Sequence, residues 1–154
     1  MFNCVYVAPH MLEASLVFCE HGIKTALAKG GIGLYTLEMV VKRLIDREWL
    51  LWIMMEDEVN VGFFITSYID GDKPWMEIVI GFINPDYQDS DYFGKGLEAV
   101  ESFSKALNCH AVLLYSARKG MKKIVKDHDY RPSMMAYKKV LINDTPTAQG
   151  SDRH

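Results

Sequence analysis

The chain has 154 residues, of which 49% are hydrophobic and 24% charged, and its net charge is -3. This size and composition are typical of one compact domain whose core needs neither metals nor disulfides. The acidic balance does not favour a nucleic-acid partner, no apolar run approaches the roughly 20 residues of a membrane helix, and the start lacks the pattern of a signal peptide. We therefore expect a cytoplasmic protein whose three cysteines, Cys4, Cys19 and Cys109, are free thiols.

The first third of the chain predicts a strand followed by helices. Asn3–Ala8 is short, partly alternating and closed by Pro9, which is typical of an opening strand. Apolar residues recur at helical spacing over His10–Lys29, so this segment is one helix, or two that are broken near Gly22. Thr36 has the position and the side chain of an N-cap for the next helix.

The middle of the chain changes to a strand pattern. Trp49–Met55, Asn60–Ile69 and Trp75–Ile83 are rich in β-branched and aromatic residues, and short polar linkers separate them. This arrangement predicts an antiparallel meander of three strands. The third segment begins as an almost continuous apolar run, which predicts burial on both faces, and Glu77 is the exception in that run.

The second half of the chain alternates between helix and strand patterns. We expect a helix at Leu97–Leu107 that stops at Asn108, a buried strand at His110–Ser116, a basic helix at Lys119–Asp127 and a last strand at Ser133–Leu141. Residues 142–154 are expected to form a flexible tail, which leaves residues 1–141 as one domain. The predicted class is α/β (α+β), with a mixed, mostly antiparallel sheet and helices on both of its faces.

Four features stand in order along this pattern. They are Glu77 in the fourth strand, the ending Ile83-Asn84-Pro85, Gly94-Lys95-Gly96 leading into a helix, and a strand led by Cys109. With the element order over about residues 3–141, they resemble the GNAT superfamily of acyltransferases. A second set of stretches resembles GNAT-like proteins encoded by tailed bacteriophages. These stretches are Trp49–Trp52, Ala99–Phe103, Asn108-Cys109, Val112–Leu114, Ala117–Met121 and Tyr137–Leu141.

The resemblance implies an N-acyltransferase that uses acetyl-CoA or another acyl-CoA. Backbone N–H groups and the helix dipole favour an anion at a helix entrance. The resemblance therefore implies that Gly94, Lys95 and Gly96 hold the pyrophosphate of the acyl-CoA. Arg118, next to the expected basic helix, is a further candidate for contacting these phosphates. A glycine-rich helix entry that holds no ligand is the alternative.

The phosphate-binding motif of the resembled family can be aligned with these glycines in two registers. One register starts at Asp91, and the other places Glu98 where the last glycine of the motif stands. Both bring an acid to the cradle, and an acid beside a pyrophosphate weakens its binding. The sequence leaves both registers open.

Glu77 is the candidate general base. A carboxylate in an apolar strand is costly unless it is paired or functional, and partial loss of hydration makes it a better proton acceptor. The resemblance implies the same role for an acid on this strand. The alternative is that strand alternation turns Glu77 to solvent or to Lys73.

The ends of two strands supply the remaining candidates. The backbone of Phe82 and Ile83 is expected to pair with the pantetheine amides in the manner of an added strand. Tyr115 or Ser116, at the end of the buried strand, is the candidate general acid, and the alternative for Tyr115 is packing in the core. The five histidines lack metal-ligand spacing, so we expect no metal.

The resemblance also implies several kinds of partner, and the sequence does not choose among them. The expected acceptor is a small-molecule or protein amine, and a homodimer or a phage or host protein is also compatible with it. A protein of this kind would act in the cytoplasm, in the host cytoplasm if a phage encodes it, or in the virion. The rival hypothesis is a GNAT-like phage protein that has lost catalysis and serves a structural or host-interaction role.

Overall fold

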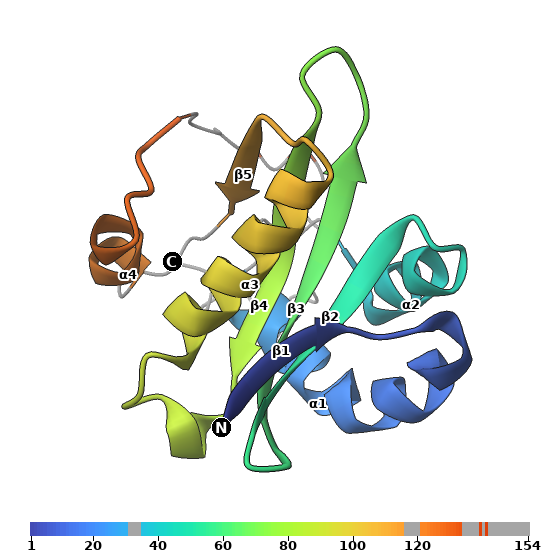
Figure 1. Ribbon diagram of the computed structural model, residues 1–154. Coiled ribbons are helices and arrows are strands. Elements are labelled where there is room, and N and C mark those ends of the chain that lie inside the picture. The colour runs from blue at the N-terminus through green and yellow to red at the C-terminus, as the bar shows by residue number, and fades with distance from the viewer. Residues whose placement is uncertain (31–34, 116–120, 134–138, 140, 142–154) are drawn as a thin grey trace.

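A computed structural model describes residues 1–30, 35–115, 121–133, 139 and 141 of the chain (Figure 1). The strands are β1 (Phe2–Tyr6), β2 (Trp49–Glu56), β3 (Val59–Ile69), β4 (Trp75–Ile83) and β5 (Ala111–Leu114). The helices are α1 (Leu12–Gly30), α2 (Leu37–Ile45), α3 (Tyr92–Ala106) and α4 (Met121–Asp127). Two 3-10 turns, η1 (Pro9–Met11) and η2 (Pro85–Tyr87), precede α1 and α3.

The described strands form one sheet in the order β1-β2-β3-β4-β5. The first three neighbouring pairs are antiparallel, and β4 and β5 are parallel. One face of this sheet packs against α1 and α2, and the other packs against α3 (Figure 1). The predicted mixed, mostly antiparallel sheet with helices on both faces is confirmed.

The helices on the first face follow the sequence pattern closely. α1 runs without a break through Gly22, so the segment is one long helix with η1 before it. A Cβ atom at Gly22 would lie 2.5 Å from the Phe63 ring, so the glycine lets α1 pack directly on β3. Thr36 is the N-cap of α2, and its hydroxyl oxygen accepts a hydrogen bond from the Met39 N–H at 3.2 Å.

The predicted meander is confirmed, and its first turn shows why the hairpin is tight. Two residues, Asp57 and Glu58, connect β2 to β3, and their φ angles are 47° and 70°. Positive φ at both central residues is the geometry of the hairpin turn whose twist matches that of the flanking strands. The β3–β4 connection is longer and includes Gly71 at a φ of 148°.

The crossover from β4 through α3 to β5 agrees with the predicted order but differs in its boundaries. α3 begins at Tyr92, so Gly94 and Gly96 lie inside its first turns instead of before the helix. Asp91 is the N-cap, and a polar residue at that position starts a helix as effectively as the glycines could. The helix ends at Ala106, and Asn108 follows in the left-handed region at a φ of 60°, which agrees with the predicted stop.

Two clusters of buried side chains stabilise the two layers. The cluster under α1 and α2 includes Ile23, Phe63 and Ile65, and the cluster under α3 includes Phe64 and Leu97.

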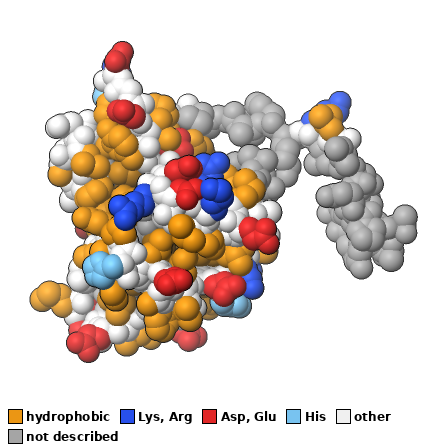
Figure 2. Space-filling model, turned by 90° about the vertical axis from the view of Figure 1, so that its right-hand side faces the viewer, with side chains coloured by type: hydrophobic (Ala, Val, Ile, Leu, Met, Phe, Trp, Pro, Cys, Tyr) orange, Lys and Arg blue, Asp and Glu red, His pale blue; other side chains and the backbone are white. Residues whose placement is uncertain are grey.

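The exposed positions of the molecule are not uniformly polar. On the side of the molecule that carries α1 and α2, hydrophobic groups lie between charged ones (Figure 2), and exposed residues of α1 include Val17 and Phe18.

Several sequence expectations fall wholly or largely outside the described residues. These are Arg118, Ser116, the start of the basic helix, most of the strand predicted at Ser133–Leu141, and the tail at residues 142–154. Within the described ranges, no helix is long and apolar enough to cross a membrane.

Candidate active site

The candidate site begins at an irregularity in β4. Thr66 of β3 pairs with Ile78, whereas the preceding residue, Ile65, pairs with Ile80, so Val79 is an extra residue in β4. An extra residue of this kind is a β-bulge, which bends its strand and strengthens the local twist. β4 therefore changes direction immediately after Ile78.

The parallel partner of β4 stops at the same place. β5 pairs with Trp75–Ile78 only, and its last paired residue is Leu114. β3 occupies the other edge of β4 as far as Ile83. Among the described residues, no strand pairs with the outer edge of Val79–Ile83, so this edge offers backbone groups to an extended ligand.

Glu77 lies two residues before the bulge, and two aromatic side chains hold its carboxylate. The Trp75 indole Nε1–H donates to Glu77 Oε1 at 3.0 Å, and the Tyr115 hydroxyl donates to the same oxygen at 3.1 Å. Within the described part of the chain, these are the partners of the carboxylate, and Lys73 is not among them. The carboxylate is thus fixed at Oε1, while Oε2 is left to accept a proton or a ligand N–H.

The structure brings together Glu77 and Tyr115, which the sequence analysis names as candidate base and candidate acid. Glu77 and Tyr115 come from neighbouring strands and are 38 positions apart in the sequence. Burial raises the pKa of the Tyr115 hydroxyl, and the hydrogen bond to Glu77 and the charge of that carboxylate raise it further. Tyr115 therefore keeps its proton at neutral pH, the state that a general acid needs before the reaction.

The surroundings of this pair are aromatic and lie on the face of the sheet that carries α1 and α2. Ser67 is buried directly opposite Glu77 on β3. Tyr35, just before α2, packs edge-on against Trp49 with ring centroids 5.1 Å apart, and it lies near enough to contribute to the raised pKa of Tyr115. Sequence reasoning missed Trp75 and Tyr35. Trp75 stands two residues from Glu77, so the period of a strand could have placed it on the same face.

The residues predicted to contact the pantetheine arm have half-buried side chains, and their backbone lies on an edge of β4 that no described strand occupies. The Phe82 ring stacks on Phe63 with centroids 5.5 Å apart, and Ile83 packs against the cluster under α3. Their side chains pack largely on the core, so the backbone is the part of these residues best placed to pair with an extended ligand. A pantetheine arm fits this part of the structure, because it needs strand-like hydrogen bonds and β4 has an outer edge to give them.

The entrance of α3 is arranged differently from a phosphate cradle. The Asp91 carboxylate accepts the Gly94 N–H at 3.2 Å through Oδ1, and its Oδ2 lies 3.3 Å from His128 Nε2. A Cβ atom at Gly94 would overlap the His128 ring, so this ring fills the space that the glycine leaves. The segment after α4 thus covers the first turn of α3.

The other two residues of the predicted cradle have contacts of their own. A Cβ atom at Gly96 would lie 2.8 Å from the Phe64 ring and 2.9 Å from Met54 Sδ, which makes Gly96 a packing residue against the sheet. The Lys95 ammonium lies 5.6 Å and 5.4 Å from the ring centroids of Phe2 and Tyr92. With Arg118 outside the described residues, the cradle stays a prediction.

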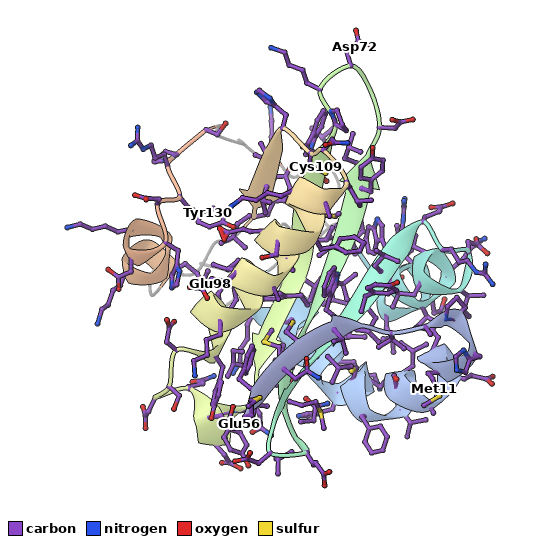
Figure 3. All side chains as sticks on the ribbon, in the orientation of Figure 1. Met11, Glu56, Asp72, Glu98, Cys109 and Tyr130 are labelled. Atoms are coloured by element: carbon purple, nitrogen blue, oxygen red, sulfur yellow. The ribbon has the colours of Figure 1, made fainter. Side chains whose placement is uncertain are left out.

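A second contact holds the same segment against α3. The Tyr130 hydroxyl donates to Glu101 Oε1 at 3.4 Å, and Figure 3 shows Tyr130 between α4 and α3. Burial raises the pKa of the Tyr130 hydroxyl, and the Glu101 carboxylate adds to this shift. His128 and Tyr130 therefore fix the segment along α3 from its first turn to Glu101.

The chemistry of the site does not depend on thiols. Cys4, Cys19 and Cys109 are free, as the sequence predicts. Burial raises the pKa of the Cys4 and Cys19 thiols to about 12 and also raises that of Cys109, so all three stay protonated near neutral pH and are poor nucleophiles. Among the residues that the structure describes, no three His, Cys, Asp or Glu side chains are grouped to hold a metal ion.

Comparisons with known proteins identify the fold. No family model and no curated protein matches the chain. An aminoglycoside acetyltransferase from an uncultured soil metagenomic sample, solved with sisomicin, matches with a TM-score of 0.70 and 12% identity over 92% of this chain and 97% of that one. A predicted acetyltransferase from Clostridium acetobutylicum, solved with acetyl-CoA, matches with a TM-score of 0.65 and 13% identity over 92% and 97%.

A GNAT family acetyltransferase from Staphylococcus aureus is a third match. Its TM-score is 0.64 and its identity 18%, over 91% of this chain and 98% of that one. At such identities the likeness establishes the fold alone, and the chain therefore has the fold of the GNAT acetyltransferases.

Proposed function

We propose that the chain is an N-acetyltransferase that transfers an acyl group from a pantetheine thioester to an amine. The observation that carries this proposal is the Glu77–Tyr115 pair beside the open edge of β4. A fixed proton acceptor, a protonated hydroxyl and a strand edge that no described strand pairs with meet there. The solved structures support the same class, because those matched above are described as acetyltransferases and one of them was solved with acetyl-CoA.

Glu77 is the proposed base. Its Oε1 is occupied by Trp75 and Tyr115, so Oε2 takes the proton of the acceptor amine. The two donors also fix the plane of the carboxylate, which removes the need to order it when the acceptor binds. The aromatic surroundings, with Tyr35 beside Tyr115, suit an acceptor that arrives as an ammonium, loses one proton to solvent and gives the second to Glu77.

Tyr115 is the proposed acid. The thioester supplies an acyl group whose C–S bond breaks while a C–N bond forms, so an amide and a thiol result. The amine proton goes to Glu77 Oε2, and the Tyr115 hydroxyl gives a proton to the departing sulfur. The Glu77 carboxyl group then releases its proton to solvent and the Tyr115 oxygen takes one up, so both residues recover their starting states.

Hydrogen exchange tests where the thioester lies. S-acetyl-pantetheine is expected to slow backbone exchange in Val79–Ile83, because its amides would pair with the outer edge of β4. Exchange in β1, an edge strand on the opposite side of the sheet, should not change. The measurement is mass spectrometry of peptides after exchange with and without the thioester at millimolar concentration. Equal exchange of Val79–Ile83 in both samples would contradict the proposed donor site.

The rival is a GNAT-fold protein without catalysis, in a structural or host-interaction role. The arrangement that favours it is the acid at the entrance of α3, where Asp91 and His128 cover the first turn. This rival predicts that neither acetyl-CoA nor S-acetyl-pantetheine changes the exchange of β4.

A further inference from the structure

The entrance of α3 is closed by the chain's own side chains. The His128 ring lies against Gly94 so closely that a methyl group there would overlap it, and only 14% of its side chain is exposed. Tyr130 holds the same segment to Glu101 of α3. A phosphate that approached the backbone at Gly94 would first have to displace this ring.

The carboxylates at the same place oppose an anion. The Gly94 N–H, a donor that a phosphate would use, is already bound by the Asp91 carboxylate. Asp86 and Asp89 are exposed in the same loop, so three carboxylates precede the helix. The nearest described cation on α3 is Lys95, whose ammonium lies over the rings of Phe2 and Tyr92. A pyrophosphate does not fit this entrance as the described residues form it.

The other half of an acyl-CoA does fit. The outer edge of β4 beyond the Val79 bulge lies next to Glu77 and offers hydrogen bonds that a pantetheine arm can use. The pantetheine arm and its thioester can thus gain binding energy at β4. The nucleotide diphosphate would instead lie beside the Asp91 carboxylate, which repels it.

We infer that the chain recognises its acyl donor through the pantetheine arm, and that the nucleotide diphosphate of an acyl-CoA adds little to its binding. This inference rests on the proposed function and names the donor class more closely, as acylated pantetheine thioesters with or without a nucleotide. The reaction is unchanged, since either thioester and an amine give an amide and a free thiol.

Calorimetry with two donors tests the inference. The wild-type protein is titrated with acetyl-CoA and, separately, with S-acetyl-pantetheine, at one ionic strength and up to millimolar concentration. The two dissociation constants are expected to agree within about tenfold. Asp91→Asn is expected to lower the dissociation constant of acetyl-CoA by about three- to tenfold, the size of charge effects at helix termini, because asparagine keeps the cap and removes the charge.

Asp70→Asn is the matched control. Asp70 is also an exposed aspartate whose Oδ1 accepts a glycine N–H, from Gly71 at 2.9 Å, but it lies in the β3–β4 hairpin at the far end of the sheet (Figure 1). Its replacement should change neither dissociation constant. S-acetyl-pantetheine serves as the internal reference for Asp91→Asn, since it has no phosphate to sense the charge.

The outcomes separate the inference from the proposed function. A wild-type preference for acetyl-CoA of more than tenfold overturns the inference and leaves the proposed function standing. An Asp91→Asn protein whose affinity for acetyl-CoA is unchanged also overturns it, because the carboxylate would then not oppose the phosphates. Failure of both thioesters to bind overturns the proposed function itself.

Discussion

Replacement of Glu77 by glutamine is expected to lower kcat for acetyl transfer by about 10²- to 10⁴-fold, the usual contribution of a positioned base. The amide oxygen of glutamine can still accept the hydrogen bonds from Trp75 and Tyr115, so the local structure should persist. What is lost is Oε2 as a proton acceptor. The measurement is the rate of thiol release from S-acetyl-pantetheine at saturating amine, together with the KM for the thioester.

The split between kcat and KM decides the role of Glu77. A base lowers kcat with little change in the KM for the donor, whereas a residue that merely shapes the site would change both. Glu13→Gln is the control, since Glu13 is an exposed acid in the first turn of α1 and should retain wild-type rates. Equal activity of Glu77→Gln and Glu13→Gln would contradict the assignment.

Replacement of Phe64 by alanine is expected to lower the free energy of unfolding by about 3–5 kcal/mol. Phe64 is 0% exposed in the cluster under α3, and its ring packs edge-on against Phe93 with centroids 4.9 Å apart. The same ring also lies against Gly81 of β4 and Gly96 of α3. Its loss would leave a cavity between the sheet and the helix. Denaturant unfolding measures the resulting decrease in the free energy of unfolding.

Phe18→Ala is the matched control for this cavity. Phe18 is 77% exposed on α1, so the same change of side chain should alter the free energy of unfolding by no more than about 0.5 kcal/mol. Similar losses in the two variants would contradict the placement of Phe64 in the core.

Local patterns predicted much of this fold. The Thr36 cap, the three-strand meander and the stop at Asn108 depend on residues close in the sequence, and the structure confirms each of them. The sequence pattern places the start of α3 too late, because the glycine pair suggests a helix entrance. Asp91 starts the helix at Tyr92, and both glycines serve close packing.

The candidate site depends on contacts that sequence patterns do not contain. The hydrogen bond between Tyr115 and Glu77 requires the register of β4 and β5, and the bulge at Val79 appears only in the pairing with β3. The cover of Gly94 by His128 joins residues far apart in the chain. Such contacts follow from the packing of whole elements, so they could not be read from spacing.

Acetyl transfer itself tests the central claim most directly. S-acetyl-pantetheine is incubated with the wild-type protein and a panel of primary amines, free thiol is followed with time, and the products are identified by mass spectrometry. The account predicts thiol release that depends on the amine, with an equal amount of acetylated amine, and its near-complete loss in Glu77→Gln. Thiol release that is absent with every amine, or that proceeds equally in Glu77→Gln, would contradict it.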